Sequence, residues 1–176
     1  QARELMAEAG ADLPLVAKLE RPQALEHLDD IVASCDAVMV ARGDLGLEMP
    51  LERVPRAQKE ITRAARRHGT PVIVATQVLE SMTTESRPTR AEVNDAANAV
   101  EDGVDAIMLA DETAAGAFPA RAVQTLDAII RDAETSPSAG ATLLLHEAVG
   151  GHTAALCEAA EASRTRMRLI SACSVE

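Results

Sequence analysis

Charged and polar side chains follow each of four apolar runs in this sequence. Lys18 and Glu20 close the first run, Asp44 follows the second, Thr76 the third and Asp111 the fourth. A lysine ammonium can neutralise an anionic reacting group, and carboxylate oxygens are the ligands that hard divalent cations prefer. If the four runs are strands of one sheet, these residues predict a site for metal-assisted enolate or phosphoryl chemistry.

The metal ligands we expect are Glu20 and Asp44. Lys18 and Glu20 are two residues apart, so on a strand both side chains leave the same face, roughly 6–7 Å apart along the chain. Carboxylates at two neighbouring strand ends suit Mg²⁺ or Mn²⁺, because magnesium usually keeps only one or two protein carboxylates. Lys18 beside such an ion would supply a second positive charge.

Each of these residues also has a simpler interpretation. Lys18 can be a solvated surface charge, Asp44 can cap a turn between two glycines, and Thr76 can be an ordinary strand-end hydroxyl. Asp111 with Glu112 can be an acidic pair at a helix entry, which the helix dipole favours. Agreement among four strand ends favours a site over four unrelated surface groups.

The apolar runs alternate with helical patterns, which predicts an α/β fold. Runs that are apolar at every position are typical of parallel strands covered on both faces, and right-handed crossovers place all their carboxyl ends at one edge. Ligands bind at that edge in α/β sheets and (β/α)₈ barrels. We expect strands within 14–20, 37–41, 71–75 and 105–110, and helices over 1–10, 22–34, 51–69, 89–103 and 119–133.

Composition excludes several classes of protein. A net charge of −11 argues against nucleic acid or an anionic membrane as the main partner, and 1% aromatic residues leave no platform for base stacking. No apolar run approaches the roughly 20 residues that span a bilayer. Three scattered cysteines fit a reducing compartment, so we expect a cytoplasmic location. His146 and His152 are six residues apart, which is not the one-turn spacing of a helical zinc site.

Five segments, in this order and spacing, closely resemble pyruvate kinase over about residues 1–135. They are AKLE, VMVARGDLGLEMP, VIVATQVLESM, RPTRAEVNDAANAV and AIMLADETAAGAFP. The resemblance implies half of a (β/α)₈ TIM barrel, strands five to eight, with a short C-terminal extension. Residues 136–176 would then be a linker and the truncated start of a C-terminal domain. The implied reaction is phosphoryl transfer from phosphoenolpyruvate to ADP, giving pyruvate and ATP in glycolysis.

The resemblance also implies roles for individual residues. Lys18 would neutralise charge on the transferring phosphoryl group and the forming enolate, and Glu20 and Asp44 would bind Mg²⁺ or Mn²⁺. The backbone at Gly43 and Asp44 would contact the substrate, and Thr76 would bind it and take part in protonating the enolate. These roles are physically coherent, because loose phosphoryl transfer needs positioning and charge neutralisation more than a protein nucleophile.

The resemblance implies further partners and shows some differences. The family uses K⁺, but the strands carrying its ligands and the nucleotide-contacting arginines have no counterpart in these residues, and a homo-oligomer is expected of the intact enzyme. Arg21 stands where the family commonly has Asn, and Ala110 with Asp111 stands where it has Ser-Gly or Ser-Ala. The added charge of Asp111 would weaken binding of an anion.

Three functions remain open from the sequence. The first is a pyruvate kinase whose second barrel half, isolated as this chain, shows little activity. The second is a divalent-metal-dependent aldolase that handles pyruvate or phosphoenolpyruvate. The third is a noncatalytic remnant, in which strand edges at 14–20 and 105–110 are exposed and pair or aggregate.

Overall fold

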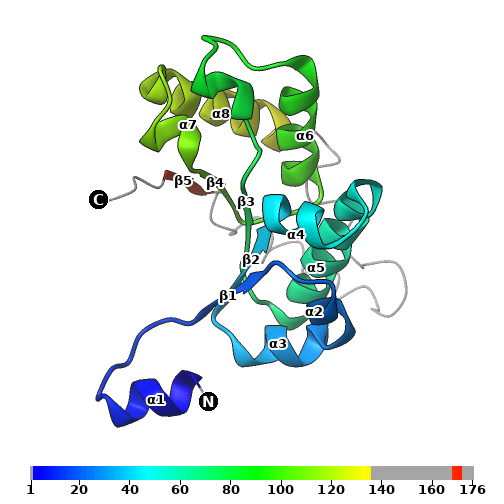
Figure 1. The fold of residues 1–176 in the computed structure, drawn as a ribbon, viewed down its shortest axis with the longest axis vertical. Coiled ribbons are helices and arrows are strands. Elements are labelled where there is room, and N and C mark those ends of the chain that lie inside the picture. Colours follow the sequence, from blue (N-terminus) through cyan, green and yellow to red (C-terminus); the bar gives the residue numbers. More distant parts are fainter. Residues whose placement is uncertain (1, 136–167, 172–176) are drawn as a thin grey trace, which may run out of the picture.

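Five parallel strands form one sheet in the computed structural model, which describes residues 2–135 and 168–171 (Figure 1). The strands lie side by side in chain order, so each neighbour in the sequence is also a neighbour in the sheet. His146 and His152, whose spacing argues against a helical zinc site, lie outside the described residues. The strands are β1 (Val16–Leu19), β2 (Ala37–Ala41), β3 (Val72–Ala75), β4 (Ala106–Leu109) and β5 (Arg168–Ser171).

Helices fill the connections between the first four strands. In Figure 1, α2, α3 and α5 gather beside β1 and β2, whereas α6, α7 and α8 gather at the other end of the sheet. Because the first four strands are parallel and joined by such crossovers, their carboxyl ends share one edge, as predicted. The helices are α1 (Ala2–Glu8), α2 (Gln23–Glu26), α3 (Leu28–Ser34), α4 (Arg42–Glu48), η1 (Leu51–Arg53), α5 (Val54–His68), η2 (Glu80–Thr83), α6 (Arg90–Glu101), α7 (Asp111–Ala114) and α8 (Pro119–Glu134).

Local sequence signals account for one end each of helices α5 and α6. Helix α5 stops at Gly69, whose φ of 69° places it in the left-handed region that glycine adopts without a steric penalty. Helix α6 begins with the predicted capping box, in which the Thr89 hydroxyl accepts from the Glu92 N–H and the Glu92 carboxylate accepts from the Thr89 N–H. The single helix predicted over 22–34 is wrong, because the backbone at His27 (φ −122°, ψ 27°) divides it into α2 and α3.

The two faces of the sheet are not equally covered. Leu19, Val40 and Val74 lie in register and are 3%, 0% and 1% exposed, so this face forms the apolar core under the helices. Met39 and Ile73, in register with Lys18, remain partly exposed on the opposite face. The expectation that both faces are covered is therefore wrong for the described residues. Lys18 emerges on the less covered face.

Strand β5 corrects the expectation of two exposed sheet edges. It pairs in parallel with β4, with Ala106 opposite Arg168 and Leu109 opposite Ser171. The edge predicted to be exposed at 105–110 is thus covered. The outer edge of β1 pairs with no strand among the residues that the structure describes.

No helix within the described part of the chain is both long and apolar enough to cross a bilayer.

Candidate active site at the carboxyl edge of the sheet

Lys18, Glu20 and Asp44 converge at the ends of β1 and β2. The Lys18 Nζ lies 2.7 Å from Glu20 Oε2 and 2.7 Å from Asp44 Oδ2. The two carboxylate oxygens are therefore no farther apart than twice that distance. Asp44 reaches this position because α4 begins directly after β2 and carries it in its first turn. We call these three residues the charged triad.

The charged triad is open to solvent. The side chains of Lys18, Glu20 and Asp44 are 52%, 40% and 43% exposed. The hydrogen bond to Asp44, and next the one to Glu20, raise the pKa of Lys18 above its ordinary value. Lys18 therefore stays an ammonium at neutral pH. Solvent screening keeps the contribution of these ion pairs to stability small.

The donor set of the charged triad suits a hard divalent cation. Glu20 Oε1 and Asp44 Oδ1 take part in neither contact with Lys18, so each carboxylate keeps one oxygen for a metal. Two carboxylates are a usual protein contribution to a magnesium site, where substrate and water complete the shell. No group of three or more candidate ligands occurs among the residues that the structure describes. Glu20 and Asp44 fit Mg²⁺ or Mn²⁺ because both ligands are hard carboxylate oxygens.

Thr76 lies against the segment that carries Asp44. Its Oγ1 accepts from the Gly43 N–H at 2.8 Å, and its hydroxyl donates to the Ala75 carbonyl at 2.7 Å. A Cβ on residue 43 would lie 3.3 Å from Thr76 Oγ1, so glycine permits this approach. Thr76 is thus joined to Gly43, whereas no hydrogen bond joins it to Lys18 or Glu20 among the described residues.

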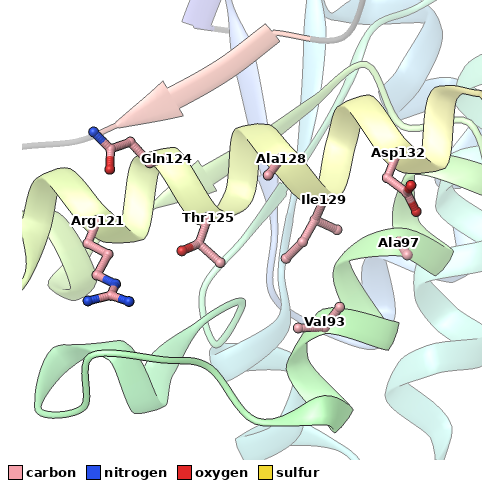
Figure 2. Close-up of a pocket in the computed structure, with 8 residues that line it drawn as sticks. All are labelled: Val93, Ala97, Arg121, Gln124, Thr125, Ala128, Ile129 and Asp132. Atoms are coloured by element: carbon pink, nitrogen blue, oxygen red, sulfur yellow. The ribbon is translucent and has the colours of Figure 1, made fainter.

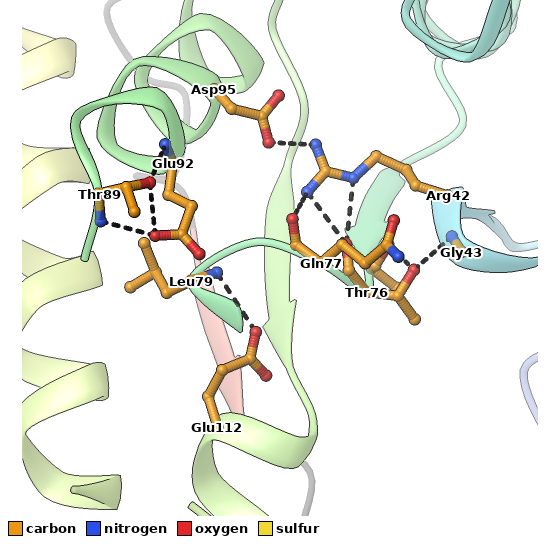
Figure 3. Close-up of polar contacts among 10 residues, drawn as sticks. Arg42, Gly43, Thr76, Gln77, Leu79, Thr89, Glu92, Asp95 and Glu112 are labelled. Carbon is orange, nitrogen blue, oxygen red and sulfur yellow. Dashed lines mark hydrogen bonds and ion pairs between the residues drawn. The ribbon is translucent and has the colours of Figure 1, made fainter. Parts of the chain in front are cut away.

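The turn after β3 has an unusual backbone that Arg42 holds. Thr76 and Gln77 have φ of 66° and 51°, a left-handed conformation that is rare for a β-branched residue. Arg42 Nε and Nη2 donate to the Thr76 carbonyl at 3.1 and 3.0 Å, and Nη2 also donates to the Gln77 carbonyl at 2.8 Å. Arg42 Nη1 pairs with Asp95 of α6 (Figure 3). The buried Arg42 thus connects the ends of two strands and a helix.

Two carboxylates hold the rest of this loop. Buried Glu112 accepts from the Leu79 N–H at 3.3 Å and the Ala110 N–H at 2.9 Å, as Figure 3 shows for Leu79. Glu92 accepts from the N–H and hydroxyl of Ser81. Burial alone would raise the pKa of Glu92, but the hydrogen bonds from Ser81 and Thr89 together lower it below its ordinary value. Carboxylates from two helices, α7 and α6, therefore hold Leu79 and Ser81 of this loop in place.

The sequence predicts no role for Arg42, and for Glu112 it predicts only a place in an acidic pair at a helix entry. Glu112 does lie in the first turn of α7. The one signal for Arg42 is a charged residue directly after an apolar run. Nothing in the sequence pointed to Asp95, which lies 53 residues from Arg42.

A groove of about 480 Å³ lies elsewhere, between α6 and α8 (Figure 2). None of the predicted site residues lines it. It therefore belongs to a different part of the surface from the charged triad. Its lining residues are Val93, Ala97, Arg121, Gln124, Thr125, Ala128, Ile129 and Asp132.

Comparison with known proteins identifies the family. The family model described as the barrel domain of pyruvate kinase matches residues 1–123. The chain belongs to the pyruvate kinase family. It is 53% identical over 140 residues to the pyruvate kinase of Mycobacterium tuberculosis, which covers 80% of this chain and 30% of that protein. It is also 55% identical over 132 residues to that of Corynebacterium glutamicum (75% and 28%) and 59% identical over 120 residues to that of Methylorubrum extorquens (68% and 25%).

The chain spans about 30% of the length of the curated pyruvate kinases that it matches. The range matched by the family model includes every predicted site residue: Lys18, Glu20, Gly43, Asp44 and Thr76. The comparisons give no support to the aldolase alternative. We therefore set that alternative aside.

Proposed function

We propose that this chain carries part of a pyruvate kinase active site, which transfers a phosphoryl group from phosphoenolpyruvate to ADP and forms pyruvate and ATP. The observation that carries the proposal is the convergence of one ammonium and two carboxylates at the carboxyl edge of the sheet. Ligands bind at this edge in α/β folds. Membership in the pyruvate kinase family supplies the reaction.

In this proposal the three residues of the charged triad have different roles. Glu20 and Asp44 would hold Mg²⁺ or Mn²⁺, which when bound supplies charge neutralisation to the substrate oxygens. Lys18 neutralises negative charge on the transferring phosphoryl group and on the enolate that remains. An ammonium suits this role, because a fixed positive charge placed where negative charge develops stabilises the transition state.

Gly43, Asp44 and Thr76 contact the organic part of the substrate. The backbone of Gly43 and Asp44 binds phosphoenolpyruvate, and the Thr76 hydroxyl takes part in delivering a proton to the methylene carbon of the enolate. Hydrogen bonds from the Gly43 N–H and to the Ala75 carbonyl fix the position of that hydroxyl. K⁺ is expected for the family, and none of the residues proposed here is assigned to it.

The larger architecture follows the family. Residues 1–135 correspond to strands five to eight of a (β/α)₈ barrel, and residues 136–176 to a linker and the start of a C-terminal domain. Strand β5, from within that second segment, adds to the same sheet. A cytoplasmic homo-oligomer is the form that we expect for the intact enzyme.

A chimera tests the proposed function. Residues 1–123 of this chain replace the matching segment of the full-length Mycobacterium tuberculosis relative, and ADP-dependent formation of pyruvate is measured. We expect Mg²⁺-dependent activity. Lys18→Met should lower kcat on the order of 10²- to 10³-fold, as for loss of a charge-stabilising donor. Arg56→Met, at a side chain that is 81% exposed, is the control and should leave kcat unchanged.

A folded chimera that makes no pyruvate would contradict the proposal and favour the noncatalytic remnant. Equal activity of the Lys18→Met chimera would contradict the role of Lys18 alone. Far-ultraviolet circular dichroism and size-exclusion chromatography establish that each chimera is folded.

A further inference from the structure

A buried guanidinium joins three elements at the candidate site. Arg42, the first residue of α4, is 8% exposed. It donates three hydrogen bonds to the carbonyls of Thr76 and Gln77 and pairs with Asp95 on α6 (Figure 3). A buried charge is costly unless it is paired and fully hydrogen-bonded, and Asp95 with the two carbonyls meets that requirement.

The carbonyls that Arg42 binds belong to the two strained residues of this loop. Thr76 and Gln77 are the positive-φ residues other than glycine in the described part of the chain. Such a conformation persists only where surrounding contacts impose it. Since the guanidinium binds both carbonyls at once, it favours the left-handed turn over a relaxed one.

The start of α4 and the turn after β3 contact each other through both side chains and backbone. The Arg42 side chain binds the Thr76 backbone, while the backbone N–H of Gly43 binds the Thr76 hydroxyl at 2.8 Å. Gly43 directly precedes Asp44 of the charged triad. The left-handed turn therefore determines where the Thr76 hydroxyl lies relative to that carboxylate.

We propose that Arg42 is a positioning residue, which with Asp95 as its anchor holds the Thr76 turn left-handed and so keeps the Thr76 hydroxyl against the Gly43 N–H. This inference rests on the proposed role of Thr76. This positioning role requires arginine, because the planar guanidinium can bind two carbonyls and a carboxylate at once. A lysine ammonium is a single point charge without that fixed set of donors.

The first test follows the geometry without any activity. Hydrogen exchange of the Gly43 amide is measured by NMR in the 176-residue chain, for wild type, Arg42→Lys, Asp95→Asn and Thr76→Val. Thr76→Val removes the acceptor and sets the unprotected reference. We expect the protection factor of the Gly43 amide to fall at least about tenfold in Arg42→Lys, approaching the value in Thr76→Val. In Asp95→Asn it should fall by a smaller factor. Both substitutions loosen the turn that holds the acceptor.

The second test follows proton transfer. In the chimera, exchange of the pyruvate methyl protons with deuterated solvent reports removal of a proton from that carbon and return of a deuteron. Arg42→Lys should lower the maximal exchange rate about 10- to 100-fold. The reason is that a displaced Thr76 hydroxyl no longer lies in the geometry needed for proton transfer. The KM for Mg²⁺ should stay within about twofold, and Arg56→Gln is the control.

Chemical rescue separates positioning from general damage. In Arg42→Ala, millimolar guanidinium should restore exchange several-fold, whereas methylammonium at equal concentration should not. A merely structural role would show no such selectivity.

Three outcomes would overturn the proposal. The first is wild-type protection of the Gly43 amide in folded Arg42→Lys and Asp95→Asn chains. The second is parallel loss of the exchange rate and of Mg²⁺ affinity, which is the signature of general damage. The third is equal rescue by both cations. A wild-type chimera without exchange would instead contradict the proposed function, and the Gly43 amide would still decide the role of Arg42.

Discussion

Two regions at the same edge of the sheet are built in opposite ways. The charged triad of Lys18, Glu20 and Asp44 is 40–52% exposed, and its members contact one another. Beside it, Arg42 and Glu112 are 8% and 3% exposed and bind the backbone of the loop after β3. We call Arg42 and Glu112, together with Thr76 and Asp95, the two partly exposed residues that Arg42 binds, the buried frame.

The difference reflects what each region has to do. Groups that meet a metal and an anion must be reachable, and exposed ion pairs contribute little to stability because water and salt screen them. Groups that hold a strained loop must be buried, since hydrogen bonds shielded from water are stronger. Substitutions in the charged triad should therefore affect activity, and substitutions in the buried frame should affect stability or geometry.

Asp44→Asn should give the largest effect and breaks the charged triad. In the chimera we expect kcat to fall on the order of 10²- to 10⁴-fold, because a metal ligand and a neutralising partner are both weakened. The free energy of unfolding should change by less than about 1 kcal/mol. Glu48→Gln, an exposed carboxylate on the same helix, is the control for charge alone. An Asp44→Asn chimera that is destabilised but keeps its kcat would contradict the proposed difference between the charged triad and the buried frame.

Glu112→Ala breaks the buried frame. It leaves the N–H groups of Leu79 and Ala110 without their acceptor, which should destabilise the chain by about 2–4 kcal/mol. Urea unfolding of the 176-residue chain measures the change. Asp111→Ala, the exposed neighbour in the same helix turn, should cost far less. Similar losses for the two variants would mean that Glu112 does not hold the loop.

Thr89→Ala sharpens the comparison at the start of α6, the helix that carries Asp95. Loss of the capping hydroxyl should cost about 1 kcal/mol of unfolding free energy. Thr89→Ser keeps the hydroxyl and should cost only a few tenths of that amount. An equal cost for both variants would assign the loss to the methyl group and not to the cap.

Glu92 gives the smallest effect, a dependence of stability on pH. Its pKa is lowered in the folded chain, so the unfolded chain binds the proton more readily. The contribution of Glu92 to stability is thus complete above the ordinary glutamate pKa of about 4.3 and is lost as the pH falls through the lower folded pKa. Denaturant unfolding between pH 3 and 6 should show a shallower slope for Glu92→Gln. An unchanged slope would contradict this account.

Much of this arrangement is predictable from the sequence because its causes are local. Apolar runs mark β1 to β4, Gly69 ends α5, and Thr89 with Glu92 opens α6. Parallel strands then bring Lys18 and Asp44 to one edge without further information. The charged triad could be assembled from these rules, although its functional roles stay a proposal.

The buried frame and strand β5 could not be predicted in this way. No local pattern places a β-branched Thr76 in a left-handed turn, because that conformation depends on Arg42, which lies 34 residues away. Asp95 enters the frame through helix packing. The four residues of β5, RLIS, form no uninterrupted apolar run of the kind that marks the other strands, although in the structure they pair with β4.

Mn²⁺ titration of the 176-residue chain, followed by electron paramagnetic resonance, tests most directly whether Glu20 and Asp44 share one cation beside Lys18. We predict one principal site, weakened at least about tenfold by Glu20→Gln and by Asp44→Asn alike and unaffected by Glu48→Gln. Lys18→Met should bind Mn²⁺ at least as tightly as wild type, because it removes a cation that competes for the same carboxylates. Unchanged Mn²⁺ binding in both carboxylate variants would contradict the shared site.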